Sequence, residues 1–303
     1  MPARVIPLLA IVAAFACTVQ RVDPKEHDHG ASGSASGTLG TLQSGQARTL
    51  PAGANDVRAR LDASPRHGEW AMIKTGPTDS VKAWVVYPQR STNAPVVVVI
   101  HEIFGLSTWV RGVADQLAAD GFIAIAPDLL TGKVEYVQGD TATQQAATTA
   151  IRTLDMADVQ RQLTAVGTWG MARPAAAKKY GVVGFCWGGS RSFQHAIQSP
   201  TGLGASVVYY GPLTPDDIPK LGQVKVPVLG LYGGNDQRVN ATIPATDSAM
   251  KSLSKTYESH VFEGAGHGFL RAQQDTARGG ANLKATEQAW PLTIGWFKKH
   301  LGA

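Results

Sequence analysis

Three side chains that together can cleave an acyl bond each stand directly after an apolar run of this sequence. Cys186 ends one run, Asp236 follows a later one, and His267 follows the last, so the chain order is thiol, carboxylate, imidazole. A thiol is a strong nucleophile, an imidazole can take its proton, and a carboxylate can hold the imidazole in orientation. These residue types in this order predict nucleophilic acyl transfer.

The segments that must position these side chains alternate between two patterns. Continuous β-branched runs predict buried strands, and helical periodicity between them predicts helices. The expected strands are a hairpin within Glu69–Pro88, then Ala94–Gly105, Gly121–Leu130, Tyr180–Cys186, Gly204–Gly211, Val226–Asp236 and Tyr257–Gly264. The expected helices are Ser107–Asp120, Thr141–Trp169, Trp187–Gln198, Ala245–Ser254 and Lys284–His300. This order predicts an α/β fold, a mostly parallel sheet flanked by helices on both faces, with the antiparallel hairpin at one edge. Ligands of such sheets bind at the carboxyl ends of the strands.

The thiol lies in the stretch Gly184-Phe185-Cys186-Trp187-Gly188, where a strand turns sharply into a helix. Side chains two residues before and after the turn would collide, which explains Gly184 and Gly188. The N–H of Trp187 begins the helix and is expected to point at the position of a developing oxyanion. The positive end of the helix dipole also favours a thiolate. The turn therefore predicts a presented nucleophile.

Alternatives stay open for several of these positions. His195 or His260 could be the base, although the first lies within an expected helix and the second within an expected strand. Asp236 after Gly-Gly-Asn is compatible with a turn former, Cys186 with an inert buried thiol, and Glu102 with a surface carboxylate. Two further strand-end residues have structural or pocket-lining interpretations: His101 and Asp128.

Four motifs together resemble the dienelactone hydrolase family of α/β hydrolases over roughly residues 70–300. They are "HEIFG", "GFCWGG", "GGND" and "GAGHGF", in that order. The resemblance implies the α/β-hydrolase fold, with Cys186 as nucleophile, His267 as base and Asp236 orienting the imidazole. It also implies that Glu102 bonds to the resting thiol and helps to take its proton. The second oxyanion donor would be the backbone N–H of Ile103.

The resemblance bears on the substrate as well. In the best-known members two arginines grip a substrate carboxylate, and Arg271 matches one of them. The segment Gly132–Gln145, which corresponds to the other, holds no arginine and only Lys133 as a cation, and Gly268 stands where those members often have serine. Aromatic residues beside strand ends could form an apolar pocket wall: Phe104, Trp187, Tyr210 and Phe269. We therefore expect a hydrolase of small esters or lactones, of the carboxymethylenebutenolidase type, that needs neither metal nor organic cofactor.

Two other classes of function remain open on the same residues. An acyltransferase or cysteine peptidase would use the same thiol with a different acceptor or substrate. A surface lipoprotein that keeps the fold without catalysis would not depend on Cys186 at all.

Residues 1–65 have a different character from the rest of the 303 residues. Met1–Ala16 is an apolar run with one arginine, too short for a membrane span and typical of an export signal, and Cys17 after it resembles a lipobox cysteine. We expect residues 1–17 to be a leader, 18–65 a flexible Gly/Ser-rich tether and 66–303 the α/β domain. The location would be periplasmic or membrane-anchored through Cys17.

Composition narrows the partners. The net charge is only +5, from 28 Lys and Arg against 23 Asp and Glu, without a basic run carrying interleaved aromatics, which disfavours nucleic-acid binding. His27, Asp28 and His29 form a weak candidate metal patch that we interpret as a solvated stretch. Only two cysteines exist, so a leader containing Cys17 leaves Cys186 unpaired. The expected partner is a small ester or lactone, and the sequence leaves the oligomeric state open, a monomer being compatible with it.

Overall fold

The computed structural model describes residues 49–90, 92–137 and 141–302. The expected leader, the lipobox at Cys17, most of the tether and the patch at His27–His29 lie outside the described residues. Within them, none of the helices combines the length and the apolar character that crossing a membrane requires. The same residues contain no group of three or more His, Cys, Asp or Glu side chains arranged to hold a metal ion.

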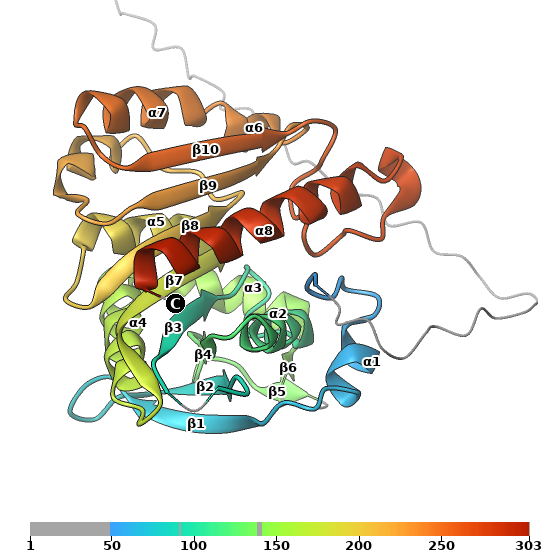
Figure 1. Ribbon diagram of the computed structural model, residues 1–303, viewed down its shortest axis with the longest axis vertical. Helices are drawn as coiled ribbons and strands as arrows, with labels where there is room; N and C mark the ends of the chain where they lie inside the picture. The colour runs from blue at the N-terminus through green and yellow to red at the C-terminus, as the bar shows by residue number, and fades with distance from the viewer. Residues whose placement is uncertain (1–48, 91, 138–140, 303) are drawn as a thin grey trace, which may run out of the picture. The chain divides into compact units, whose positions relative to one another are not determined.

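An eight-stranded sheet forms the centre of the domain, in the order β1-β2-β4-β3-β7-β8-β9-β10 (Figure 1). Strands β3, β4 and β7 to β10 run parallel, whereas β2 pairs antiparallel with both β1 and β4. The strands are β1 Gly68–Lys74, β2 Ser80–Val86, β3 Ala94–Ile100, β4 Ile123–Asp128, β7 Ala176–Phe185, β8 Leu203–Tyr209, β9 Val228–Gly233 and β10 Tyr257–Phe262. A separate two-stranded sheet consists of β5 Tyr136–Val137 and β6 Thr141–Ala142. The expected mixed sheet with a hairpin at one edge is confirmed.

Helices cover both faces of this sheet. They are α1 Val57–Asp62, α2 Thr108–Ala119, α3 Gln144–Ala150, α4 Met156–Met171, α5 Trp187–Gln198, α6 Gln237–Asn240, α7 Ile243–Ser252 and α8 Ala281–Leu301, with short 3-10 turns at Ile151–Thr153, Ile218–Gln223 and Thr276–Arg278. Helices α2 and α8 share one buried cluster with the sheet, and α4 packs on the opposite face. Figure 1 shows α8 crossing in front of β7, β8 and β9. Because both faces are covered, every residue of β3 is buried, as its unbroken apolar run predicts.

The order of the strands reverses direction at β3 and β7. After β3 the chain adds β4 on one side of it and then returns to add β7 on the other side. The loops that leave β3 and β7 therefore diverge to opposite faces of the sheet, and ligands of such sheets bind where this happens. His101 and Glu102 follow β3, and Cys186 follows β7.

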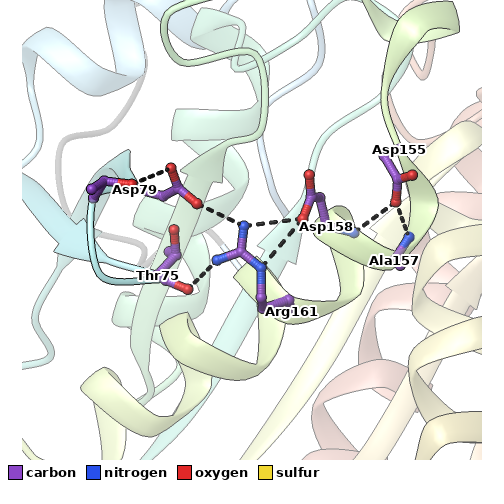
Figure 2. A network of polar contacts seen from close by, with 7 residues as sticks. Thr75, Asp79, Asp155, Ala157, Asp158 and Arg161 are labelled. Carbon is purple, nitrogen blue, oxygen red and sulfur yellow. Dashed lines mark hydrogen bonds and ion pairs between the residues drawn. The ribbon is translucent and has the colours of Figure 1, made fainter.

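The long helix expected over Thr141–Trp169 is wrong, because the segment divides into β6, α3, a 3-10 turn and α4. The break falls at Leu154 and Asp155, whose backbones are extended. The Asp155 carboxylate accepts the N–H groups of Ala157 and Asp158 at 2.8 and 3.0 Å and so begins a new helix (Figure 2). An N-cap carboxylate stabilises a helix start by about 1 kcal/mol, enough to select this boundary.

Arg161 on α4 ties that helix to the β1–β2 hairpin. Its guanidinium donates to the backbone carbonyl of Thr75, lies 3.0 Å from Asp79 Oδ2 and contacts Asp158 on its own helix (Figure 2). The hairpin is thus anchored to the helix layer as well as to β4, which gives the edge of the sheet a fixed position.

Residues 50–65, which the sequence groups with the tether, belong to the packed domain. Ala52 and Val57 are 2% and 5% exposed, and Trp109 of α2 donates its indole N–H to the Ala52 carbonyl at 3.0 Å. The composition of this segment predicted flexibility, because Ala52 and Val57 have no apolar partner nearby in the sequence. Their partners lie on α2, about fifty residues along the chain.

Candidate active site

Cys186 sits at the turn between β7 and α5 with a backbone conformation that non-glycine residues rarely adopt, φ 56° and ψ −115°. The flanking glycines make this turn possible. A Cβ on Gly184 would lie 1.9 Å from the carbonyl oxygen of Gly188, and a Cβ on Gly188 would lie 2.4 Å from the carbonyl oxygens of Ile100 and His101. The turn therefore presses the chain against the end of β3 and holds the thiol there.

Two backbone donors lie near the thiol of Cys186, because the N–H groups of Trp187 and Ile103 both act to lower its pKa. Burial raises the pKa of this thiol to about 11, and the nearby charge of Glu102 acts in the same direction, against the smaller effects of the two donors and of Arg238. The resting thiol is consequently neutral at pH 7. Two donors converging at one point also form a site for a developing negative charge.

His101 fixes the loop that provides the Ile103 donor. Its Nε2 accepts the N–H of Leu129 at 3.2 Å, so its Nδ1 carries the proton and donates to the Glu102 carbonyl at 2.7 Å. Burial lowers its pKa to about 4, and its ring stacks on Trp187 with centroids 5.6 Å apart. Between packing and pocket lining, the structure gives His101 the first role.

Asp236 and His267 lie at the ends of β9 and β10, and the distance from His267 Nδ1 to Asp236 Oδ2 is 2.5 Å. Asn235 joins the two loops, because its backbone N–H donates to Ala265 O at 2.9 Å and its side chain donates to Gly264 O at 3.0 Å. Asp236 is 8% exposed, so little water competes with its carboxylate for the imidazole N–H. This pairing leaves His267 Nε2 as the nitrogen with a free lone pair.

The alternative histidines lie in other surroundings. His195 is fully buried, bonded to Tyr180 Oη at 2.9 Å and to Gln160 Oε1 at 2.7 Å, which is a structural network. His260 is on β10 and lies 3.8 Å from Glu258 at the surface. Asp128, the other strand-end carboxylate, accepts the hydroxyl of Tyr136 and the N–H of Leu130, so it organises the loop after β4.

Glu102 is buried beside the thiol, with only 4% of its surface exposed. Burial raises its pKa to about 7, partly offset by the charge of Arg271, whose Nε lies 3.5 Å from Glu102 Oε2. The resemblance implies a hydrogen bond from the resting thiol to this carboxylate. In the described part of the chain Glu102 pairs with Arg271 instead, and its influence on Cys186 is that of a nearby charge.

Replacing Glu102 by glutamine is expected to make the thiol of Cys186 easier to ionise. Since the carboxylate raises the thiol pKa only when it is charged, and its own pKa is about 7, the effect should be absent at pH 6 and grow above pH 7. The iodoacetamide alkylation rate measured from pH 6 to 10 should be up to about tenfold higher in Glu102→Gln at the alkaline end. The surface variant Glu258→Gln serves as control. A constant ratio across the range would contradict the charge coupling.

The aromatic residues expected to line a pocket are placed unequally. Phe104 is partly exposed and lies under the guanidinium of Arg271, 5.0 Å from ring centroid to Cζ. Tyr210 is buried with φ 41°, and its ring centroid lies 5.1 Å from that of His267. Phe269 is fully buried against Tyr210, which makes it part of the core rather than a wall open to substrate. The place of Phe269 two residues after His267 predicted a pocket wall. Its burial depends on the neighbouring strands, which its place in the sequence does not reveal.

Two cations outside the motifs differ in their relation to the site. Lys133 is exposed and lines a cavity of about 690 Å³ together with residues of α3, a cavity that Arg271 does not line. Arg238, in the first turn of α6, is exposed, and its charge acts to lower the pKa of Cys186. Arg238 was not predicted from the sequence. Its only signal was its place two residues after Asp236.

Comparison with known proteins adds a family to this geometry. The model of the dienelactone hydrolase family matches residues 81–301. A protein of Methylorubrum extorquens named "Putative carboxymethylenebutenolidase" is 30% identical over 234 residues, which are 73% of this chain and 77% of that protein.

Solved structures share the fold. The dienelactone hydrolase of Anabaena variabilis superimposes with a TM-score of 0.58 at 23% identity, covering 78% of this chain and 99% of that one. A dienelactone hydrolase-like promiscuous phosphotriesterase from metagenomic libraries gives a TM-score of 0.65 at 22% identity, over 78% and 98% of the two chains.

Proposed function

Because this chain belongs to the dienelactone hydrolase family of α/β-hydrolase fold, we propose that it hydrolyses small carboxylic esters or lactones through a thioester on Cys186. The observation that carries the proposal is the thiol held on two converging backbone N–H groups at a strained turn, at the same end of the sheet as the Asp236–His267 pair. An inert cysteine would not require this turn or these donors.

The proposed reaction has two halves. Cys186 Sγ attacks the ester carbonyl carbon while its proton passes to His267 Nε2, and the oxyanion accepts the N–H groups of Ile103 and Trp187. When the carbonyl re-forms, the C–O bond to the leaving group breaks and His267 protonates the departing alkoxide. Water, deprotonated by His267, then attacks the thioester, releases the carboxylic acid and restores the thiol. Each oxyanion donor contributes about 3 kcal/mol in comparable hydrolases.

Asp236 would hold the imidazole with Nε2 facing the reaction and stabilise the imidazolium that forms in each half. Glu102 would keep the sulfur neutral between turnovers, which protects it from oxidation because the thiolate is the form that oxidises. Export of the enzyme by residues 1–17 remains part of this proposal.

The direct test is hydrolysis by the purified protein of 4-nitrophenyl esters and of simple lactones, with the matching anilides as control. Esters and lactones should be cleaved and anilides should not, since an anilide nitrogen is a poor leaving group from a tetrahedral intermediate on sulfur. Treatment with iodoacetamide should abolish the activity. Undiminished hydrolysis by a fully alkylated protein would refute the cysteine mechanism.

A further inference from the structure

Residues 263–275, called the histidine loop below, carry His267 between glycines that leave the backbone free to move. Gly264 and Gly268 have φ 74° and 72°, and Gly266 stands directly before His267. Glycine has more backbone freedom than any other residue, and a Cβ on Gly268 would meet no described atom within 4 Å beyond its chain neighbours. The position of the imidazole therefore depends on bonds that reach the loop from other elements.

Asn282, in the first turn of α8, binds the histidine loop at two points with one amide. Its Oδ1 accepts the N–H of Gly266 at 2.9 Å, and its Nδ2 donates to the carbonyl of Ala272 at 3.1 Å. Both partners are backbone groups, so only one orientation of the amide satisfies them, because the opposite one would set donor against donor and acceptor against acceptor. The two bonds enclose the segment that contains His267.

The surroundings of Asn282 make it a rigid support. Gly279 and Gly280, with φ 57° and 77°, turn the chain into α8 directly before it. The helix is tied to the end of α2, because Trp290 donates its indole N–H to Asp120 Oδ2 at 2.9 Å. Asn282 is only 2% exposed, so water cannot replace either of its bonds, and breaking one leaves a buried backbone group unpaired.

The clamp acts on both neighbours of His267. Gly266, the residue before it, is bound by Asn282 directly. Gly268, the residue after it, is bound through Ala272, whose N–H donates to the Gly268 carbonyl at 3.0 Å while its own carbonyl accepts the amide. One side chain of α8 thereby fixes the backbone on each side of the imidazole.

We propose that Asn282 is a positioning residue that holds His267 in line with Asp236, acting through the backbone of Gly266 and Ala272. The inference rests on the proposed function only in that His267 serves as the base, and the contact of His267 with Asp236 can be observed without catalysis. Without the amide, the glycines would let the loop shift, and a displacement of about 1 Å in a catalytic group costs up to about a hundredfold in rate.

The kinetic test compares two substitutions of Asn282 with a control on the same helix. Asn282→Leu has a similar volume and loses both bonds, whereas Asn282→Asp can still accept the Gly266 N–H. The control is Thr286→Val, because the buried Thr286 hydroxyl donates to the Asn282 carbonyl within α8. For a 4-nitrophenyl ester, kcat should fall at least about tenfold in Asn282→Leu, at least about threefold in Asn282→Asp and less than about threefold in Thr286→Val, with KM changed less than about twofold. Equal losses in all three would mean that only the stability of α8 matters and would overturn the inference.

A double substitution separates positioning from a general structural effect. Asp236→Asn already removes the alignment of the imidazole, so adding Asn282→Leu to it should lower kcat less than about threefold further. A full multiplicative loss would show that Asn282 acts elsewhere. Asn282→Asp takes the place of the leucine variant in this cycle if the latter does not fold.

Proton NMR gives a readout that needs no activity. The His267 Nδ1 proton, held by Asp236 at 2.5 Å, should give a strongly deshielded resonance that is absent from His267→Ala. This resonance should be broadened or lost in Asn282→Leu and kept in Thr286→Val. An unchanged resonance in Asn282→Leu would overturn the inference. Its loss there, in a protein whose unmodified form cleaves no ester, would uphold the positioning role and refute the hydrolase.

Discussion

Replacing Cys186 with alanine is expected to lower kcat/KM for a 4-nitrophenyl ester by at least about a thousandfold, because the substitution removes the sulfur on which the proposed thioester forms. The two backbone donors remain, so the residual rate should still exceed that of the uncatalysed reaction. Alanine has no atom beyond Cβ to disturb the turn, and because the buried thiol that it replaces is neutral, the substitution changes no buried charge. The thermal unfolding midpoint should therefore stay within a few degrees of the unmodified protein.

This measurement separates the three classes of function that the sequence left open. A non-catalytic lipoprotein predicts no change in any activity attributed to the chain. An acyltransferase predicts the same loss, but its unmodified form would pass the acyl group to an added alcohol or amine faster than to water. Near-native ester hydrolysis by a folded Cys186→Ala protein would end the nucleophile hypothesis.

Asp236→Asn should reduce kcat by about a thousandfold or more while leaving KM nearly unchanged. The His267 Nδ1–Asp236 Oδ2 contact of 2.5 Å holds the imidazole with its proton on Nδ1. An asparagine amide presented as a donor would favour the opposite tautomer, which places the proton on Nε2 and removes the base. The charge that stabilises the imidazolium is lost at the same time.

The matched control is Asp128→Asn, which alters another buried carboxylate at a strand end. Asp128 bonds to Tyr136 and Leu130 and has no contact with His267 among the described residues. Its substitution should change kcat less than threefold. Comparable losses in both variants would mean that Asp236 acts through the stability of the sheet end and does not orient the imidazole.

The family and the fold class were predictable because their signals are local. Four motifs stand directly after strands, and strand and helix periodicities can be read within windows of about ten residues. The bounds of α5 match the expected Trp187–Gln198, because the turn at Cys186 and the left-handed residue Ser199 terminate the helix by their own backbone conformation. The start of α4 was predicted wrongly, although its signal is local as well. A single capping carboxylate, Asp155, outweighed a continuous helical periodicity.

In the candidate site, too, local features were predictable from the sequence and contacts between distant segments were not. The residue types at the ends of β3, β7, β9 and β10 were readable from order and spacing alone. The pairing of Glu102 with Arg271, the burial of Phe269 and the charge of Arg238 near the thiol were not. Each depends on which loops meet above the sheet, and that is decided by a strand order different from the chain order.

The sequence by itself therefore determined the order of strands and helices, the sharp turn that presents Cys186 and the identity of its acid and base candidates, since these depend on neighbours within a few residues. Only the tertiary structure decided that Asp236 lies 2.5 Å from His267, that the resting thiol is kept neutral by burial, and that Ala54 and Val57 line the same cavity as Arg271. These properties arise from desolvation and from contacts between segments up to about 220 residues apart, and a one-dimensional pattern does not encode either of them.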